Sequence, residues 1–270
     1  MSALHQASAP IAPSYAPSLG VSVVIPAWNE EDRLPGALDK YLPLGKDFSD
    51  RFEVIVVADG VTDRTVDVAA RYASRGVRLI RFDHRLGKGG AVISGLRAAR
   101  FGVVGFVDAD APVTPDSIVR MWKTLENADA AIGSRRLPES AITKRPPVMR
   151  RFFSWGWNLL ARLLLDLQIR DTQCGAKFFR AEPVLRVLPK VTLTNWAFDA
   201  SLLFHLRKSG STIVEVPVEW GDDPNTKLRL DRVVPAMFLS LIGIRLMNIR
   251  FLPRFTRAWA GIFFSQFERN

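Results

Sequence analysis

Residues 103–111, Val-Val-Gly-Phe-Val-Asp-Ala-Asp-Ala, carry the pattern that decides the fold. An apolar run of strand length leads directly into two acids, Asp108 and Asp110. Residues two apart in an extended segment point the same way, so both carboxylates can face one hard divalent cation. Two carboxylates alone hold Mg²⁺ weakly, and a substrate diphosphate would supply further oxygen ligands. An isolated Asp-x-Asp is also common at ordinary strand ends, so its meaning depends on the neighbouring segments.

Three similar apolar runs precede this stretch, with segments of helical spacing between them. The runs are Val21–Pro26, Phe52–Val57 and Val77–Phe82, and helices are expected near Leu34–Leu42, Thr65–Ser74 and Gly89–Ala99. This alternation predicts an α/β fold with a mostly parallel sheet that helices flank on both faces. In such sheets ligands bind outside the carboxyl ends of the strands, so the loops after these runs form the candidate site.

The loops after all four runs are polar. They contain Trp28 and Glu30, then Asp59, then Lys88, and finally the two acids after residue 107. A single acid at such a place often caps the next helix, but the coincidence of four loops favours a shared site. The sequence around Lys88, Gly-Lys-Gly-Gly, could present backbone N–H groups and an ammonium to a phosphate. It is neither a P-loop nor a dinucleotide fingerprint, which disfavours triphosphate hydrolysis and hydride transfer.

Composition restricts the alternatives. The chain has 270 residues, 48% of them hydrophobic and 24% charged, which is typical of one globular domain. Its formal net charge of +10 favours anionic partners. A nucleic-acid binder would explain that charge but not the loop carboxylates, which repel phosphate, so no nucleic-acid partner is expected. The single cysteine, Cys174, excludes an intramolecular disulfide framework and a cysteine-rich zinc site.

Seven segments, in their order along the chain, carry a family resemblance: VVIPAWNEE, VIVVADGVTD, LGKGGA, VDADA, GSR, RDTQCGAKFF and WAFDASLL. Together they closely resemble the inverting family-two glycosyltransferases of the GT-A fold, and most of all the synthases of polyprenyl-phosphate (dolichyl-phosphate) sugars. The resemblance spans about residues 21–228. It implies metal-dependent transfer of a hexose from a nucleotide sugar to polyprenyl or dolichyl phosphate with inversion. RDTQCG and LGKGGA resemble the glucose branch, which favours UDP-glucose, and a GDP-mannose-dependent mannose synthase is the alternative.

The resemblance also implies roles for individual residues. The nucleotide sugar would be bound by Pro26, Trp28, Glu30, Val57, Asp59, Lys88 and Asp108; Mg²⁺ or Mn²⁺ by Asp108 and Asp110; and the acceptor phosphate by Arg135, Arg151 and Lys227. Asp108, Asp110 and Arg135 would be the catalytic residues.

Three departures from the family pattern leave other functions open. Ala58 replaces the first acid of a usual Asp-Asp-Gly-Ser, Ala111 and Pro112 follow the metal motif, and Ser201 stands where Glu is common. One alternative is a family-two transferase with a soluble or glycan acceptor. Another is a non-catalytic nucleotide-sugar sensor, against which the retention of Asp108 and Asp110 argues.

The ends of the chain differ from its middle. Residues 1–20 are rich in Ala, Ser and Pro and are expected to be a flexible leader, followed by a GT-A domain over residues 21–230. Residues 231–270 are expected to form amphipathic helices at a membrane surface, because basic and aromatic side chains interleave there around apolar segments too short to span. A helical pair that completes the core or an oligomer interface is the alternative. The expected location is peripheral, on the cytoplasmic face of a membrane.

Overall fold

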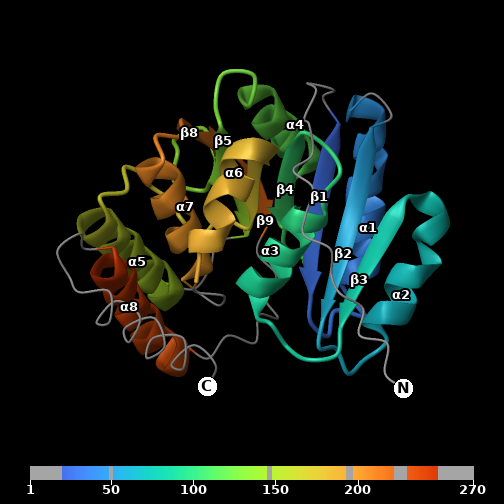
Figure 1. The fold of residues 1–270 in the computed structure, drawn as a ribbon, viewed down its shortest axis with the longest axis horizontal. Helices are drawn as coiled ribbons and strands as arrows, with labels where there is room; N and C mark the ends of the chain where they lie inside the picture. Colours follow the sequence, from blue (N-terminus) through green and yellow to red (C-terminus); the bar gives the residue numbers. More distant parts are fainter. Residues whose placement is uncertain (1–19, 49–50, 145–147, 193–196, 222–229, 249–270) are drawn as a thin grey trace, which may run out of the picture.

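The structure is a computed structural model that describes residues 20–48, 51–144, 148–192, 197–221 and 230–248. A seven-stranded sheet in the order β3-β2-β1-β4-β7-β5-β8 forms its centre, and β6 pairs with β9 in a second sheet (Figure 1). In the large sheet β7 is antiparallel to both neighbours and all other pairs are parallel. The strands are β1 (Val21–Ala27), β2 (Phe52–Asp59), β3 (Val77–Phe82), β4 (Val103–Val107), β5 (Ala130–Ser134), β6 (Ala141–Lys144), β7 (Ala176–Arg180), β8 (Ile213–Pro217) and β9 (Glu219–Gly221).

The large sheet confirms the mostly parallel architecture expected from the sequence. Strands β1 to β4 begin at the four predicted residues, and β1 pairs with β2 on one side and with β4 on the other. The chain therefore builds outward from β1 to β3 and then returns to place β4 against the opposite side of β1. This reversal is the topological switch point at which α/β sheets bind ligands, and it brings the loops after β1 and β4 together.

Helices cover both faces of the large sheet, again as expected. They are α1 (Leu34–Tyr41), α2 (Thr65–Arg71), α3 (Lys88–Ala98), α4 (Pro115–Thr124), α5 (Val148–Leu165), α6 (Ala181–Val187), α7 (Phe198–Lys208) and α8 (Leu230–Met247). Side chains of β1 alternate between two buried clusters, Val23 and Ile25 packing with α1 and α4, and Val24 packing with α3, α6 and α7. The period of two along β1 thus fixes which helices lie on which face.

A third buried cluster joins α5 and α8 to α7 at one end of the molecule (Figure 1). Trp157 and Ala161 of α5 pack there with Leu241 and Ile244 of α8. The described part of the predicted C-terminal helical region, α8, therefore packs against the main body of the protein. No helix among the described residues is both long and apolar enough to cross a membrane. The predicted leader lies outside the described residues except for Gly20, as do residues 249–270 of the tail.

Candidate active site

The turn after β4 holds Asp108 and Asp110 in a fixed geometry. The backbone N–H of Asp108 donates to the carbonyl of Gly175 over 3.0 Å, and the N–H of Ala111 donates to the carbonyl of Asp108 over 3.0 Å. Ala111 has φ of +47°, a left-handed conformation that costs a non-glycine residue about 1 kcal/mol or more. Lys40 of α1 stabilises this conformation, because the Lys40 ammonium donates a hydrogen bond to the Ala111 carbonyl over 2.6 Å. The two acids therefore project from a turn that its own hydrogen bond and two other segments, the one that contains Gly175 and helix α1, hold in place.

Carboxylates crowd this turn. Desolvation by surrounding protein atoms and the nearby carboxylate of Asp108 raise the pKa of Asp110 to about 6, although the Asp110 side chain remains accessible to solvent. Lys88, the first residue of α3, lies 2.6 Å from Asp108 Oδ1. Burial disfavours the charged ammonium, but the attraction of Asp108 outweighs it and raises the pKa of Lys88. One ammonium thus partly compensates two carboxylates, and the remaining negative charge favours a bound cation.

The donor set fits a divalent cation that is shared with a ligand. Asp108 and Asp110 supply hard carboxylate oxygens, which Mg²⁺ and Mn²⁺ prefer. Within the described residues no cluster of three or more His, Cys, Asp or Glu side chains could hold a metal ion by itself. The protein would therefore contribute two acidic ligands and leave positions open for oxygens of a diphosphate.

Asp59 positions the loop that presents Lys88. Its carboxylate accepts hydrogen bonds from the backbone N–H groups of Leu86, over 2.5 Å, and Gly87, over 3.0 Å. Burial raises the pKa of Asp59 in spite of these two bonds. Gly87 has φ of +82°, which favours glycine at the N-cap of α3. Asp59 is almost fully buried, and in this structure its side chain shapes the loop; its predicted contact with the nucleotide stays a prediction.

The loop after β1 contributes an aromatic ring and a second acid. Trp28 is exposed, and the guanidinium of Arg85 lies 3.6 Å from the centroid of its ring. Glu30 accepts two hydrogen bonds from Arg33, over 2.7 and 2.9 Å, while burial raises the pKa of Glu30. The carboxylates of Asp110 and Asp108 also contribute to raising the pKa of Glu30, so the loop after β1 is within electrostatic range of the turn after β4. Sequence reasoning did not single out Arg33 and Arg85, because neither belongs to a recognisable motif.

Pro26 and Val57 lie on paired strands at the same register position. Pro26 is partly buried, whereas Val57 has no exposed surface and packs in the cluster beneath α3. The side chain of Val57 therefore supports the sheet under the site in this structure.

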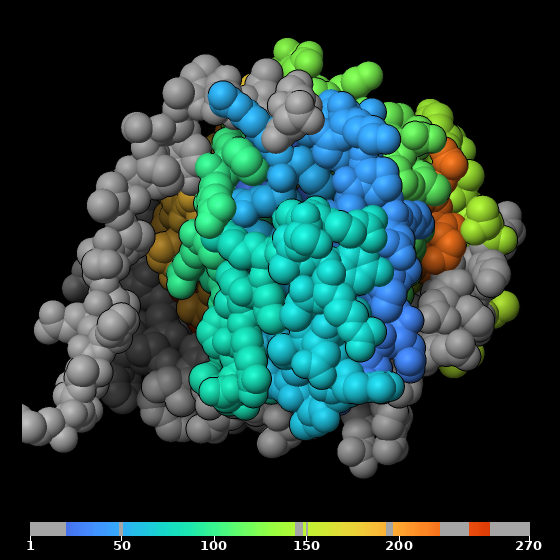
Figure 2. Space-filling view, turned by 90° about the vertical axis from the view of Figure 1, so that its right-hand side faces the viewer, coloured from blue at the N-terminus to red at the C-terminus, as the bar shows by residue number. Residues whose placement is uncertain are grey.

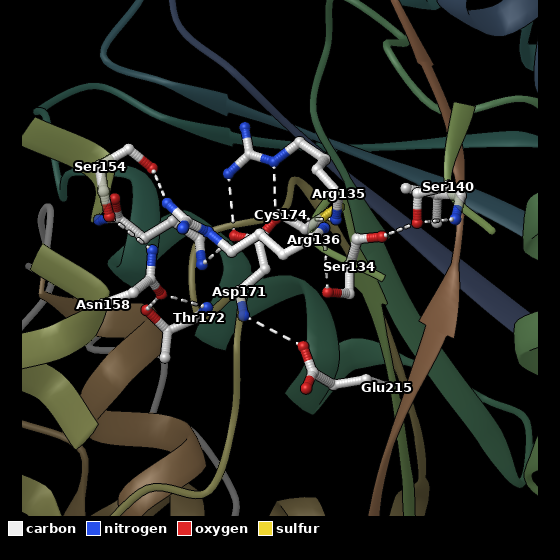
Figure 3. Close-up of polar contacts among 12 residues, drawn as sticks. Ser134, Arg135, Arg136, Ser140, Ser154, Asn158, Asp171, Thr172, Cys174 and Glu215 are labelled. Atoms are coloured by element: carbon white, nitrogen blue, oxygen red, sulfur yellow. Dashed lines mark hydrogen bonds and ion pairs between the residues drawn. The ribbon is translucent and has the colours of Figure 1, made fainter. Parts of the chain in front are cut away.

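Arg135, which follows β5, is bound by a buried carboxylate (Figure 3). Its Nε and Nη2 donate to Asp171 over 2.7 and 2.9 Å, and its backbone N–H donates to the same side chain over 3.0 Å. Burial alone would raise the pKa of Asp171, but the Arg135 guanidinium outweighs it and lowers that pKa to about 2. Asp171 has no exposed surface. Sequence reasoning placed Arg135 at the site but missed this partner, although Asp171 lies in the RDTQCG segment.

Within the described part of the chain, no hydrogen bond or ion pair brings the other predicted acceptor-binding residues to this ion pair. Arg151 is exposed on α5, and Lys227 lies outside the described residues. Arg136, which the sequence did not single out, donates from Nη2 to Ser154 of α5 over 3.0 Å (Figure 3). Burial and the neighbouring Arg135 lower the pKa of Arg136. Two adjacent guanidinium groups therefore stand between the end of β5 and α5.

Comparison with known proteins agrees with this geometry. Residues 22–188 match the family described as Glycosyl transferase family 2. A dolichyl-phosphate beta-glucosyltransferase of Mus musculus is 33% identical over 260 residues, covering 90% of this chain and 78% of the relative. One of Drosophila melanogaster is 36% identical over 230 residues, covering 79% and 70%.

A solved structure shares the fold. Glucosyl-3-phosphoglycerate synthase from Mycobacterium tuberculosis, crystallised with Mn²⁺, uridine diphosphate and phosphoglyceric acid, aligns with a TM-score of 0.63. The alignment has 23% sequence identity and covers 87% of this chain and 80% of that one. The chain is a glycosyltransferase of the GT-A type, and it belongs to glycosyl transferase family 2.

Proposed function

We propose that this glycosyltransferase transfers glucose from UDP-glucose to polyprenyl or dolichyl phosphate with inversion at the anomeric carbon. The observation that carries the proposal is the group formed by Asp108, Asp110 and Lys88 at the switch point of the sheet. Such a group suits a diphosphate whose oxygens complete the shell of a divalent cation. Relatives that are 36% and 33% identical to this chain are named dolichyl-phosphate beta-glucosyltransferases, which supports a lipid phosphate as the acceptor.

An anionic acceptor simplifies the chemistry that the protein must perform. An alcohol acceptor needs a general base, whereas a phosphate monoester already carries roughly −1.5 to −2 charge near neutral pH. The protein then has to hold the phosphate behind the anomeric carbon and stabilise the departing nucleoside diphosphate. We assign Asp108 and Asp110 to the metal ion, and Arg135, Arg151 and Lys227 to the acceptor phosphate. When bound, Mg²⁺ or Mn²⁺ would offset the negative charge that develops on the leaving diphosphate.

A transfer assay tests the reaction. The full chain is incubated with radiolabelled UDP-glucose, a short-chain polyprenyl phosphate and Mn²⁺, and the product is extracted into organic solvent. We expect label in the organic phase, its loss in excess chelator and its return when Mn²⁺ is added back. Full turnover in excess chelator would contradict the metal assignment. Label that moves only to a water-soluble glycan would favour the soluble-acceptor alternative, and UDP-glucose binding without any transfer would favour a sensor.

The donor preference is tested separately. The similarity to glucosyltransferases supports UDP-glucose over GDP-mannose. Isothermal titration in the presence of Mn²⁺ is expected to give tighter binding of UDP than of GDP. A clear preference for GDP would reverse the donor assignment and favour a mannose synthase.

The proposed acceptor requires access to a bilayer. We therefore propose that the protein acts as a peripheral enzyme on the cytoplasmic face of a membrane, where a nucleotide sugar and a lipid phosphate can both reach the site.

Gly175 provides a test of how tightly Asp108 must be positioned. A methyl group at Gly175 would overlap the carboxylate of Asp108, closer than the 3.0 Å that real Cβ atoms keep. We expect Gly175→Ala to lower turnover about a hundredfold, because a shift of roughly 1 Å in a catalytic group has an effect of this size. The matched control is Gly156→Ala, since Gly156 has no neighbouring atom within 4 Å of an added Cβ. Equal activities of the two folded variants would show that the position of Asp108 is not critical.

A further inference from the structure

Helix α5 presents a continuous apolar stripe to solvent. Val148, Phe152, Trp155, Leu159 and Leu163 follow one another at spacings of three or four residues and are between 38% and 75% exposed. Side chains at these spacings lie on one face of a helix. Single exposed apolar residues are ordinary on a protein surface, but a row of five large ones along one helix marks an interaction site.

The opposite face of α5 is already occupied. Trp157, Ala161 and Leu165 are buried in the third cluster with α7 and α8. Among the described residues, α5 packs into the core through that opposite face and not through the exposed stripe. It is a second apolar face on a helix that has already docked.

The charge on α5 is entirely positive. The helix contains Arg150, Arg151 and Arg162 and no acidic residue over its 18 positions. Arg151 and Arg162 are exposed, and by helical periodicity both lie along the same side of the stripe. The neighbouring α8 adds exposed Phe238 and, seven residues later on the same face, exposed Arg245. Large apolar side chains bordered by arginines complement a surface that is apolar inside and anionic outside.

Polar contacts fix this helix relative to the site. Trp157 donates from Nε1 to Thr172 Oγ1 over 3.1 Å, and the backbone N–H of Thr172 donates to Asn158 over 2.8 Å. Thr172 directly follows Asp171, the partner of Arg135, and Arg136 bonds Ser154 (Figure 3). Whatever covers the stripe is thus held at a fixed place relative to the two guanidinium groups.

We propose that the α5 stripe docks this protein onto an anionic lipid bilayer, with its apolar side chains in the headgroup boundary and Arg162 against acidic headgroups. A second copy of the chain is disfavoured, because a two-fold interface would bring the arginines of one stripe toward those of the other. Residues 249–270 are disfavoured for the same reason, because they contain four arginines and a single acid, Glu268. The bilayer is the occupant that complements both the apolar residues and the positive charge.

The proposal gives the lipid acceptor a defined approach, and this part rests on the proposed function. A polyprenyl phosphate keeps its chain in the bilayer and its phosphate at the surface. Docking through α5 would bring that surface to the helix whose Ser154 binds Arg136, so that the phosphate can approach Arg135 and Arg136 while its lipid chain stays in the membrane.

Sedimentation with vesicles tests membrane docking by the α5 stripe without any substrate. The full chain is mixed with phosphatidylcholine vesicles that contain or lack phosphatidylglycerol. We expect Phe152→Ser/Trp155→Ser/Leu163→Ser to weaken binding by more than about tenfold, because three inserted side chains are lost. The control Phe152→Leu/Trp155→Phe/Leu163→Met keeps the positions apolar and should bind within about twofold of the parent protein. Unchanged binding by the folded serine variant would overturn the proposal.

The positive charge has its own matched pair of variants. Arg162→Ala should weaken binding to phosphatidylglycerol vesicles about fivefold and leave binding to phosphatidylcholine alone unchanged. Arg71→Ala removes the same charge from α2, which lies on the face seen in Figure 2 and at the opposite side of the molecule from α5 in Figure 1. Arg71→Ala should leave binding to both kinds of vesicle unchanged. Equal losses from both variants would show that only net charge matters and would contradict docking by α5.

Two further measurements separate this proposal from its alternatives and from the proposed function. If the parent chain is a dimer that the serine variant dissociates, the stripe is an interface between copies and the bilayer assignment is wrong. In the transfer assay, the serine variant should retain activity on a short soluble polyprenyl phosphate and lose it on a vesicle-embedded one. If the parent chain transfers to neither acceptor, the proposed function fails, while the vesicle experiment still decides whether α5 docks.

Discussion

Replacing Asp110 with asparagine is expected to lower glucose transfer about a thousandfold or more while the fold remains intact. In the proposed metal site Asp108 and Asp110 are the two charged protein ligands, so the change would remove half of them. Desolvation and the carboxylate of Asp108 raise the pKa of Asp110 to about 6 and outweigh the attraction of Lys88 and Arg33, so replacing this carboxylate with a neutral amide should not destabilise the fold. Initial rates at limiting Mn²⁺, together with urea unfolding of the same variant, measure the two effects.

A neighbouring acid provides the control for this prediction. Asp116 is exposed in the first turn of α4, a few residues beyond the metal motif, and Asp116→Asn removes the same charge at a similar place in the chain. That variant should keep nearly full activity. We also expect a large excess of Mn²⁺ to restore part of the activity of Asp110→Asn, because its defect is in cation affinity. Normal activity of the folded variant at limiting Mn²⁺ would contradict the metal assignment.

The first half of the sheet could be predicted from the sequence because its strands are continuous and buried. Val21–Ala27 and Val103–Val107 contain almost nothing but apolar residues, which is typical of parallel strands covered on both faces. Strand β7 follows a different rule. It contains Lys177, which has no exposed surface and donates to the carbonyl of Cys174 and to Asp199 over 2.8 and 2.6 Å. A pattern of apolar residues cannot indicate that a lysine is buried when distant partners satisfy its ammonium.

At the site, too, the sequence could not reveal contacts between residues that are distant along the chain. The order of strands and loops was enough to place Asp108, Asp110 and Lys88 at one edge of the sheet, and the structure brings Lys88 against Asp108. The sequence did not reveal that Asp171, 36 residues away, holds Arg135. Nor did it show that Gly175 must be small because Asp108 packs against it. Both relations depend on tertiary contacts between segments that share no local periodicity.

Asp171→Asn is expected to destabilise the fold by about 3–5 kcal/mol, because it leaves the guanidinium of Arg135 without its buried countercharge. Urea unfolding at pH 7 measures the loss. The matched control is Asp39→Asn, which breaks the exposed pair of Asp39 with Arg75 and should cost less than about 1 kcal/mol.

The pH dependence of the free energy of unfolding tests whether the ion pair between Asp171 and Arg135 causes this loss of stability. The pKa of Asp171 is lowered to about 2 in the folded protein, because Arg135 outweighs the effect of burial, against about 3.9 in an unfolded chain. A lowered pKa means that the pair stabilises the fold fully above the unfolded value and that this contribution is lost as the pH falls toward 2. The difference in free energy of unfolding between the parent protein and Asp171→Asn should therefore stay constant from pH 7 to about pH 4 and become smaller below pH 4. A gap that does not change with pH would assign the loss to packing, and a loss no larger than that of Asp39→Asn would show that Arg135 does not depend on Asp171.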